Sequence, residues 1–159
     1  MSPEKNFTHL DAKGQAHMVD VSDRDISTRT ARASGKVLLS QAVVAMLLDG
    51  SVPKGDVLAT ARLAGIMGAK RTPDLIPLAH PIALHSVSVE LQVTDEGVTI
   101  VTYVRTADRT GVEMEALTAV SIAALTIIDM VKSINPGATI TDIHVDSKDG
   151  GRNGAWKRT

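Results

Sequence analysis

Residues 84–106 read LHSVSVELQVTDEGVTIVTYVRT, and this stretch decides the fold. Apolar and polar residues alternate over 84–93 and again over 98–106, which is the period of strands that bury one face. The residues between them, TDEG at 94–97, end in glycine and are typical of a hairpin turn. The sequence therefore predicts a β-hairpin, the start of an antiparallel sheet.

Two strands and two helices are predicted upstream of the hairpin. Residues 27–38 alternate like a strand, and HMVDVS at 17–22 is a shorter strand candidate. Residues 40–50 are predicted as a helix with Ser40 as N-cap and Gly50 as its stop. A second helix is predicted over 56–70, after the break at Pro53 to Gly55.

The remaining elements complete one sheet with helices on one side. Three prolines within residues 72–81 predict a connector without regular structure. A long helix is predicted from residue 111 to the NPG at 135–137, followed by a strand over 138–147. The order strand, helix pair, strand, strand, helix, strand favours an α+β, ferredoxin-like fold, an antiparallel sheet with helices packed on one face.

Length and polarity divide the chain into three parts. Its 159 residues suit one domain with a single core. Residues 1–16 are polar and aperiodic and are expected to be a flexible arm, and 150–159 a mobile tail. The catalytic domain is therefore placed at 17–149.

Composition excludes several classes of protein. The chain has only three aromatic residues and a net charge of −1, so neither base stacking nor a basic surface for nucleic acid is expected. It has no cysteine, which rules out disulfides and thiolate metal sites. The start of the sequence lacks a secretory signal, and no apolar run reaches the roughly 20 residues of a membrane span. A cytoplasmic protein is the simplest expectation.

The long helix carries a candidate acid and base. No charge occurs from Ala116 to Ile128, and Asp129 and Lys132 then follow within TIIDMVK. Residues three apart share a helix face, so a weak surface ion pair is one interpretation. The alternative is proton transfer, because the apolar helix predicts burial all round and a lysine at the edge of a low-dielectric region can lower its pKa.

The start of the same helix contains two glutamates. Thr110 and Glu113 fit a capping box, which would explain Glu113 as a structural residue. Glu115 is either a solvent-facing residue favoured by the helix dipole or a ligand contact. Glu115 and Asp129 are separated by roughly 21 Å along the helix, so both cannot touch one reacting bond. They serve either opposite ends of an extended ligand or sites completed by a neighbouring chain.

A histidine and three cations are further binding candidates. His80 precedes Pro81 on a proline-stiffened loop, a rigid mount for a binding residue. Its spacing from His85 matches no standard zinc pattern, so no metal site is expected. Lys54 lies beside a predicted helix start, and Lys148 and Arg152 flank two glycines, both suited to phosphate. An ordinary exposed role is the alternative for each.

Four segments together resemble a known family. HMVDVS, KGDVLATARLAGIMGAKRTPDLIPLAHP, TGVEMEALTAVSIAALTIIDMVK and KDGGRNG are similar, in order and spacing, to the molybdenum cofactor biosynthesis protein C family, the cyclic pyranopterin monophosphate synthases. The resemblance implies a ferredoxin-like hexamer, a trimer of dimers with active sites between subunits. It also implies a lyase that converts 3′,8-cyclo-7,8-dihydroguanosine triphosphate to cyclic pyranopterin monophosphate and pyrophosphate. No redox cofactor is implied, and Mg²⁺ with the triphosphate is left open.

The resemblance also assigns residues. Asp129 and Lys132 would be the acid-base pair. The substrate would be contacted by Leu78, Ala79, His80, Met114 and Glu115, with Glu113 and Lys54 nearby. On chemical grounds we expect Lys54 and His80 to contact phosphate or ribose oxygens, and Lys148 or Arg152 to assist pyrophosphate departure. The chain departs from the family at Ala79, where cysteine is usual, at Ile128, where tyrosine is frequent, and at Arg152, where lysine is common. An arginine can bind phosphate but cannot donate a proton, so catalysis by Arg152 is in doubt.

Two other functions stay open from the residues alone. The chain could be a non-catalytic binding protein for a nucleoside triphosphate that keeps the same scaffold and pocket. It could also be a structural oligomer whose buried helix carries incidental charges. Formation of product would distinguish an enzyme from the non-catalytic binding protein. The oligomeric state tests whether two chains can form one site, on which the enzyme hypothesis depends.

Overall fold

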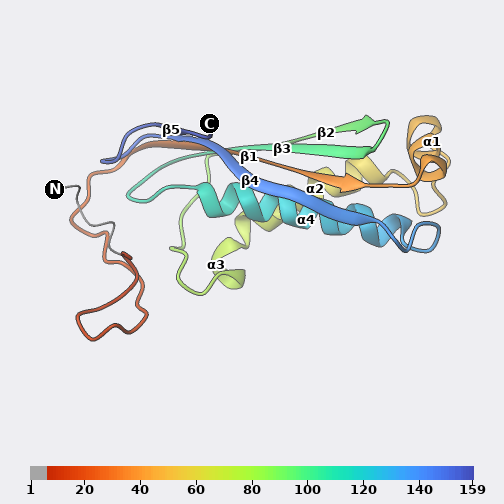
Figure 1. Cartoon of the computed structure of the whole chain (residues 1–159). Coiled ribbons are helices and arrows are strands. Elements are labelled where there is room, and N and C mark those ends of the chain that lie inside the picture. Colours follow the sequence, from red (N-terminus) through yellow and green to blue (C-terminus); the bar gives the residue numbers. More distant parts are fainter. Residues whose placement is uncertain (1–6) are drawn as a thin grey trace.

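Five antiparallel strands form one sheet, with the first helix at one end of it and the other helices together below one face (Figure 1). The computed structural model describes residues 7–159, so part of the predicted arm lies outside the described residues. The elements are β1 (Ser27–Leu38), α1 (Gln41–Asp49), α2 (Val57–Lys70), α3 (Thr72–Leu75), β2 (Ser86–Thr94), β3 (Gly97–Asp108), α4 (Glu113–Val131), β4 (Thr139–Asp149) and β5 (Trp156–Lys157). This is the predicted α+β, ferredoxin-like arrangement.

The sheet is built around its two longest strands. The strand order is β2-β3-β1-β4-β5, and β1 pairs with β3 along its whole length, from Ser27 opposite Asp108 to Leu38 opposite Gly97. The predicted hairpin is confirmed as β2 and β3. The predicted N-cap Ser40 is confirmed, since its hydroxyl accepts from the Val43 N–H, and the predicted start of the second helix is confirmed by the Asp56 carboxylate, which accepts from the Ala59 N–H.

Three local predictions need correction. HMVDVS at 17–22 is not a strand, because its backbone lies outside the sheet and the Val19 carbonyl accepts from a side chain, His80, instead of a neighbouring strand. The proline connector contains the short helix α3, which Pro73 permits because proline is tolerated in a first helical turn. Trp156–Lys157 add an edge strand to β4 that was not predicted, whereas the mobility of 150–159 stays a prediction.

The long helix α4 lies between the sheet and α2. Ten of its residues are buried, including Ala116, Val120, Ala124 and Ile127. Gly65 and Gly68 of α2 allow the close approach, since a Cβ at Gly68 would lie 2.7 Å from the Ile122 side chain. Seven of the thirteen residues of the apolar run at 116–128 are buried, five are half-buried, and Leu125 is 54% exposed. By length and composition alone α4 could cross a membrane, contrary to the prediction, but its packing is that of a core helix.

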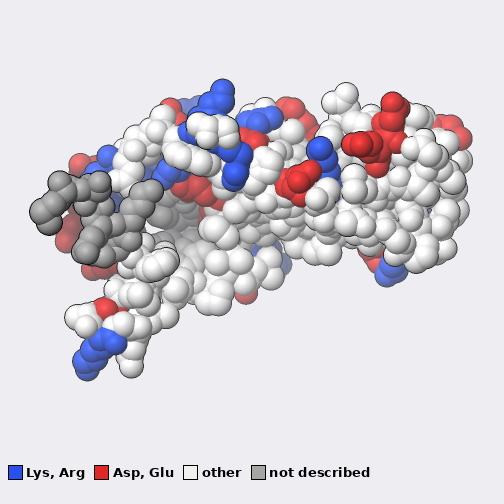
Figure 2. Space-filling model, in the orientation of Figure 1, with Lys and Arg blue, Asp and Glu red and all other residues white. Residues whose placement is uncertain are grey.

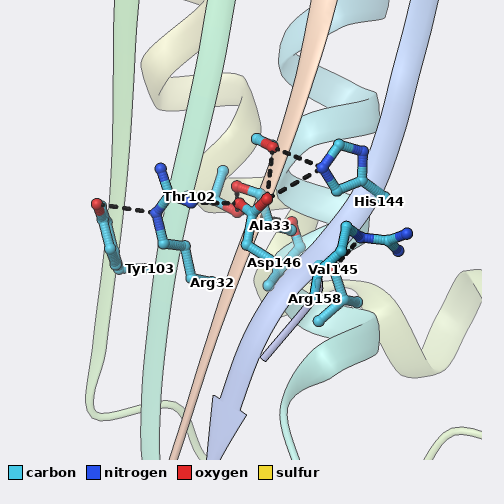
Figure 3. Close-up of polar contacts among 10 residues, drawn as sticks. Arg32, Ala33, Thr102, Tyr103, His144, Val145, Asp146 and Arg158 are labelled. Atoms are coloured by element: carbon cyan, nitrogen blue, oxygen red, sulfur yellow. Dashed lines mark hydrogen bonds and ion pairs between the residues drawn. The ribbon is translucent and has the colours of Figure 1, made fainter. Parts of the chain in front are cut away.

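The opposite face of the sheet carries a network of polar side chains (Figure 3). Asp146 lies at its centre, 2.7 Å from Arg32 and 3.0 Å from both Ser34 and His144. Arg32 also donates to the Tyr103 hydroxyl. Ser34 and Asp146 both approach the same imidazole nitrogen, Nε2, so this group lacks the relay geometry of a Ser–His–Asp triad. The network therefore holds adjacent strands together rather than activating the serine.

Replacing Gly97 with alanine is expected to lower the free energy of unfolding by about 2–4 kcal/mol. Gly97 has φ +144°, and a Cβ there would overlap the Val37 carbonyl oxygen across the β1–β3 ladder. The matched control is Gly137→Ala, where the nearest atom would be 3.8 Å away, and it is expected to change stability by less than about 1 kcal/mol. Urea unfolding measures both, and equal losses would contradict the steric explanation.

Candidate functional site

The start of α4 places two glutamates side by side in different environments. The helix begins at Glu113, with Val112 as N-cap and no side-chain cap. The predicted capping box of Thr110 and Glu113 is therefore wrong, because Glu113 is the first helical residue and not the third. Its carboxylate instead pairs with Lys148 of β4, with 3.2 Å between Oε1 and Nζ.

Glu115 is buried and lies in the first turn of the helix. Only 3% of the residue is exposed, so the solvent-facing interpretation is wrong. Burial raises the pKa of Glu115 to about 7, and the nearby charge of Glu113 contributes in the same direction. At neutral pH this carboxyl group can therefore exist in both protonation states. It can accept a hydrogen bond as a carboxylate and donate one as an acid.

A cavity of about 430 Å³ opens beside these glutamates. Its walls come from the connector before β2, the first turn of α4 and residues upstream of β1, with Val19, Val21 and Arg24 among the latter. Six of the predicted site residues line it: Leu78, Ala79, His80, Glu113, Met114 and Glu115. The structure thus brings together residues from two distant segments of the sequence in a cavity of the size that small ligands occupy.

A second group of charges lies at the other end of α4. The Lys132 Nζ is 2.7 Å from the Asp129 Oδ1, and the Lys54 Nζ donates to the Asp129 backbone carbonyl, also at 2.7 Å. Both members of the pair are well exposed, as the surface-pair interpretation predicts. The hydrogen bond from Lys132, then the charges of Lys132 and Lys54, lower the pKa of Asp129. Asp129 is therefore an ionised acceptor, and protons at this end must come from a lysine.

The two groups do not meet within one chain. Both Glu115 and Asp129 belong to the continuous helix α4, which separates them by roughly 21 Å. Within one chain Lys54 contacts the far end of the helix, so its place near the substrate contacts stays a prediction that requires a neighbouring copy. Each end alone has part of a site: a cavity with ionisable carboxyl groups, or an exposed cluster of two cations and a carboxylate.

The two C-terminal cations, Lys148 and Arg152, differ in where their side chains lie. Lys148 lines a small polar cavity of about 180 Å³ that adjoins the larger one through Thr110, Gly111 and Glu113. Arg152 lies in the following turn and is exposed, outside the lining of both cavities. No contact in the described part of the chain supports a role for Arg152, which stays a prediction.

Sequence reasoning missed Arg24 as a cavity residue. Arg24 lines both the large and the small cavity, so it adds a cation where they join. Arg29 lines the small cavity, and its guanidinium donates to the carbonyls of Asp108 and Arg109. Nothing in the local sequence pattern separates these arginines from ordinary surface residues, since their place at the cavities depends on how the start of β1 and the segment before it lie against the start of α4.

The raised pKa of Glu115 makes a testable prediction for stability. Glu115 of the folded protein holds its proton to about pH 7, whereas an ordinary glutamate with a pKa of 4.5 loses it well below that pH. The folded state binds the proton more tightly, so its contribution is complete below about pH 4.5 and is lost as pH rises to about 7. The free energy of unfolding of wild type should fall by about 3 kcal/mol more across this range than that of Glu115→Gln, which stays neutral.

Urea unfolding at several pH values between about 4.5 and 8 measures this difference. Glu113→Gln is the matched control, because Glu113 belongs to the same turn but is paired with Lys148 and half-buried. It should retain most of the decline with pH. Parallel curves for wild type and Glu115→Gln would show that the carboxyl group is not buried as described.

Comparison with known proteins gives consistent matches along the chain. The model of the MoaC family matches residues 18–151. A Streptomyces coelicolor protein named cyclic pyranopterin monophosphate synthase is 60% identical over 99% of this chain and 92% of its own length. A Nocardioides protein of the same name is 57% identical over 97% of this chain and 96% of that protein. A Mycobacterium tuberculosis protein named cyclic pyranopterin monophosphate synthase 2 is 56% identical over 96% of this chain and 91% of its own length.

Proposed function

The chain belongs to the MoaC family, and on that premise we propose that it is a cyclic pyranopterin monophosphate synthase of molybdenum cofactor biosynthesis. The substrate is 3′,8-cyclo-7,8-dihydroguanosine triphosphate, and the products are cyclic pyranopterin monophosphate and pyrophosphate. The observation that carries this proposal is the near-full-length similarity to proteins of that name. A GTP-derived substrate favours the cytoplasm, and neither nucleic acid nor a membrane has a part in the proposal.

The residues of the two groups fit the requirements of this reaction. It opens and rebuilds rings and closes a cyclic phosphate, so it needs proton transfer and cations that stabilise phosphate charge. We assign proton transfer to Lys132, oriented by the ionised Asp129, with Lys54 as a phosphate contact. The carboxyl groups of Glu113 and Glu115 accept hydrogen bonds from the ring N–H groups of the substrate.

Other contacts complete the proposed site. Leu78, Ala79, His80 and Met114 line the cavity with these glutamates. Ala79 can still present its backbone to a ligand, so the missing cysteine side chain costs little. Lys148, paired with Glu113, and Arg152 are assigned to the departing pyrophosphate, with Arg152 as a phosphate contact only. The proposal includes no resident cofactor and no metal held by protein side chains.

A complete site requires a second chain. The cavity and the Asp129–Lys132 pair lie at opposite ends of α4, so a neighbouring copy must bring its pair to the cavity. The helix layer also exposes large apolar side chains, with Leu63 64%, Met67 61% and Leu125 54% exposed. Figure 2 shows few charged side chains below the sheet, over the helix layer. These features support the proposed hexamer, a trimer of dimers, because packing between copies would bury the apolar residues.

The decisive experiment is incubation of the purified protein with the cyclised dihydro-GTP. The enzyme is expected to release pyrophosphate and form cyclic pyranopterin monophosphate in equal amounts, measured by coupled phosphate detection and mass spectrometry. Tight binding of the substrate without product would favour the non-catalytic binding protein instead. If the protein neither binds the substrate nor forms product, the structural oligomer is the hypothesis that remains.

Light scattering after size exclusion tests the assembly separately. The proposal predicts the mass of six chains. A stable monomer that is fully active would contradict the composite site, because one chain does not bring the two groups together.

A further inference from the structure

The imidazole of His80 is held by the backbone of the segment 18–22. Its Nε2 lies 2.6 Å from the Val19 carbonyl oxygen, a contact between residues 61 positions apart in the sequence. A carbonyl oxygen can only accept, so Nε2 must be the nitrogen that carries the proton. Within the described chain Nδ1 has no hydrogen-bond partner.

The segment 18–22 also divides two cavities. Val19, Val21 and His80 line both the cavity beside Glu115 and a neighbouring cavity of about 450 Å³. Met18, Asp20 and Ser22 line only the latter. The segment thus forms a partition in which Val19 and Val21 border both cavities and the residues between and beside them border one, and His80 contacts it at Val19.

An aspartate fixes the turn of this partition. The Asp20 Oδ1 accepts a hydrogen bond from the Ser22 N–H at 2.9 Å, the local geometry of an Asx turn. That hydrogen bond lowers the pKa of Asp20, so the acceptor stays ionised at neutral pH. Because Asp20 directly follows Val19, the turn restricts the peptide group whose carbonyl faces His80.

We propose that the segment 18–22 positions His80 for substrate binding, with the Val19 carbonyl selecting the Nε2–H tautomer and Asp20 holding that carbonyl in place. This inference rests on the proposed function, in which His80 contacts the substrate. In this proposal Val19 and Asp20 position His80 and do not themselves contact a reacting atom.

The tautomer decides what His80 can recognise. In the neutral imidazole the remaining nitrogen, Nδ1, is an acceptor and needs a donor on the ligand. A sugar hydroxyl or a ring N–H supplies one, whereas a fully ionised phosphate oxygen does not. His80 is therefore a contact for the ribose-derived or ring portion of the substrate, and the phosphates belong to the cations.

Nitrogen-15 NMR of the ligand-free protein tests the tautomer directly. At about pH 8 the ring is neutral for an ordinary histidine, and His80→Asn assigns its signals among the five histidines. Wild type should show a protonated Nε2, an unprotonated Nδ1, and an Nε2 proton that exchanges at least about tenfold more slowly than that of exposed His17. An Nδ1–H tautomer, or exchange as fast as in His17, would overturn the proposal without any variant.

Two substitutions of Asp20 separate its role from general stability. Asp20→Ala removes the acceptor and should accelerate exchange of the His80 proton and raise KM about fivefold, with a smaller change in kcat, whereas Asp20→Asn keeps an acceptor and should resemble wild type. The control is Asp11→Ala, which breaks a similar turn onto Lys13 and Gln15. Unchanged exchange and KM in Asp20→Ala would overturn the role of Asp20.

Failure of the proposed function has a different signature. If wild type forms no product from the cyclised dihydro-GTP but His80 shows the slowly exchanging Nε2 proton, the proposed function fails and the positioning by segment 18–22 stands. If product forms normally but His80 carries its proton on Nδ1, the positioning inference fails and the function stands.

Discussion

Lys132→Ala is expected to slow pyrophosphate release by about 10²–10⁴-fold, the usual effect of removing a group that transfers protons in the transition state. Asp129 is held ionised by Lys132 and Lys54, so within this cluster the proton donor has to be a lysine. Single-turnover measurements with saturating substrate separate this chemical step from binding. Light scattering should show an unchanged assembly, because the pair is exposed and contributes little to folding.

The chain contains a close control for this substitution. Lys36 forms another exposed ion pair, 3.6 Å from Asp142, on the sheet face remote from the helices. Lys36→Ala should leave turnover within about twofold of wild type, since surface pairs of this kind contribute little. Lys132→Arg should remain slow, because arginine keeps the charge but does not release its proton. Normal turnover in Lys132→Ala would remove this residue from the mechanism.

Mixing two inactive variants is expected to restore activity to about a quarter of wild type. Glu115→Gln damages the cavity and Lys132→Ala damages the far end of α4, so each alone should retain at most about a tenth of wild-type activity. When equal amounts are unfolded together and refolded, half the sites receive an intact cavity and, independently, half receive an intact lysine. About one site in four is then complete if two chains form each site.

A second mixture controls for the refolding procedure. Asp129→Asn and Lys132→Ala damage the same end of the helix, so no combination of these chains supplies an intact pair. Their mixture should stay as inactive as its components. The absence of any gain with Glu115→Gln and Lys132→Ala, while refolded wild type is active, would show that one chain supplies the whole site.

The elements that depend on neighbouring residues in the chain, such as the hairpin and two helix starts, could be predicted from the sequence. The hairpin follows from alternation and a turn, and the helix starts at Ser40 and Asp56 follow from side chains that accept from the N–H group three residues further on. The same kind of reasoning failed at Thr110, because the helix begins two residues later than a capping box requires. Local capping signals identify a helix better than they fix its first residue.

The site itself was only partly predictable. The resemblance named Glu113, Glu115 and His80, but the burial of Glu115 and its pKa depend on β-strands and α2 packing around α4. The segment 17–22 alternates like a strand, but the Val19 carbonyl accepts a hydrogen bond from the His80 side chain instead of from a neighbouring strand. The contact of Lys54 with the end of α4 could not be predicted for a related reason, because a motif match orders residues along the chain without saying which end of a helix they reach.

The length of α4 has a consequence for how the enzyme responds to dilution. In the proposed assembly each copy of this helix contributes to two different active centres, so an isolated chain has no whole one. Specific activity should then depend on protein concentration and should decline together with oligomer mass as the solution is diluted. A cell that makes too little of this protein would lose catalysis faster than it loses the protein.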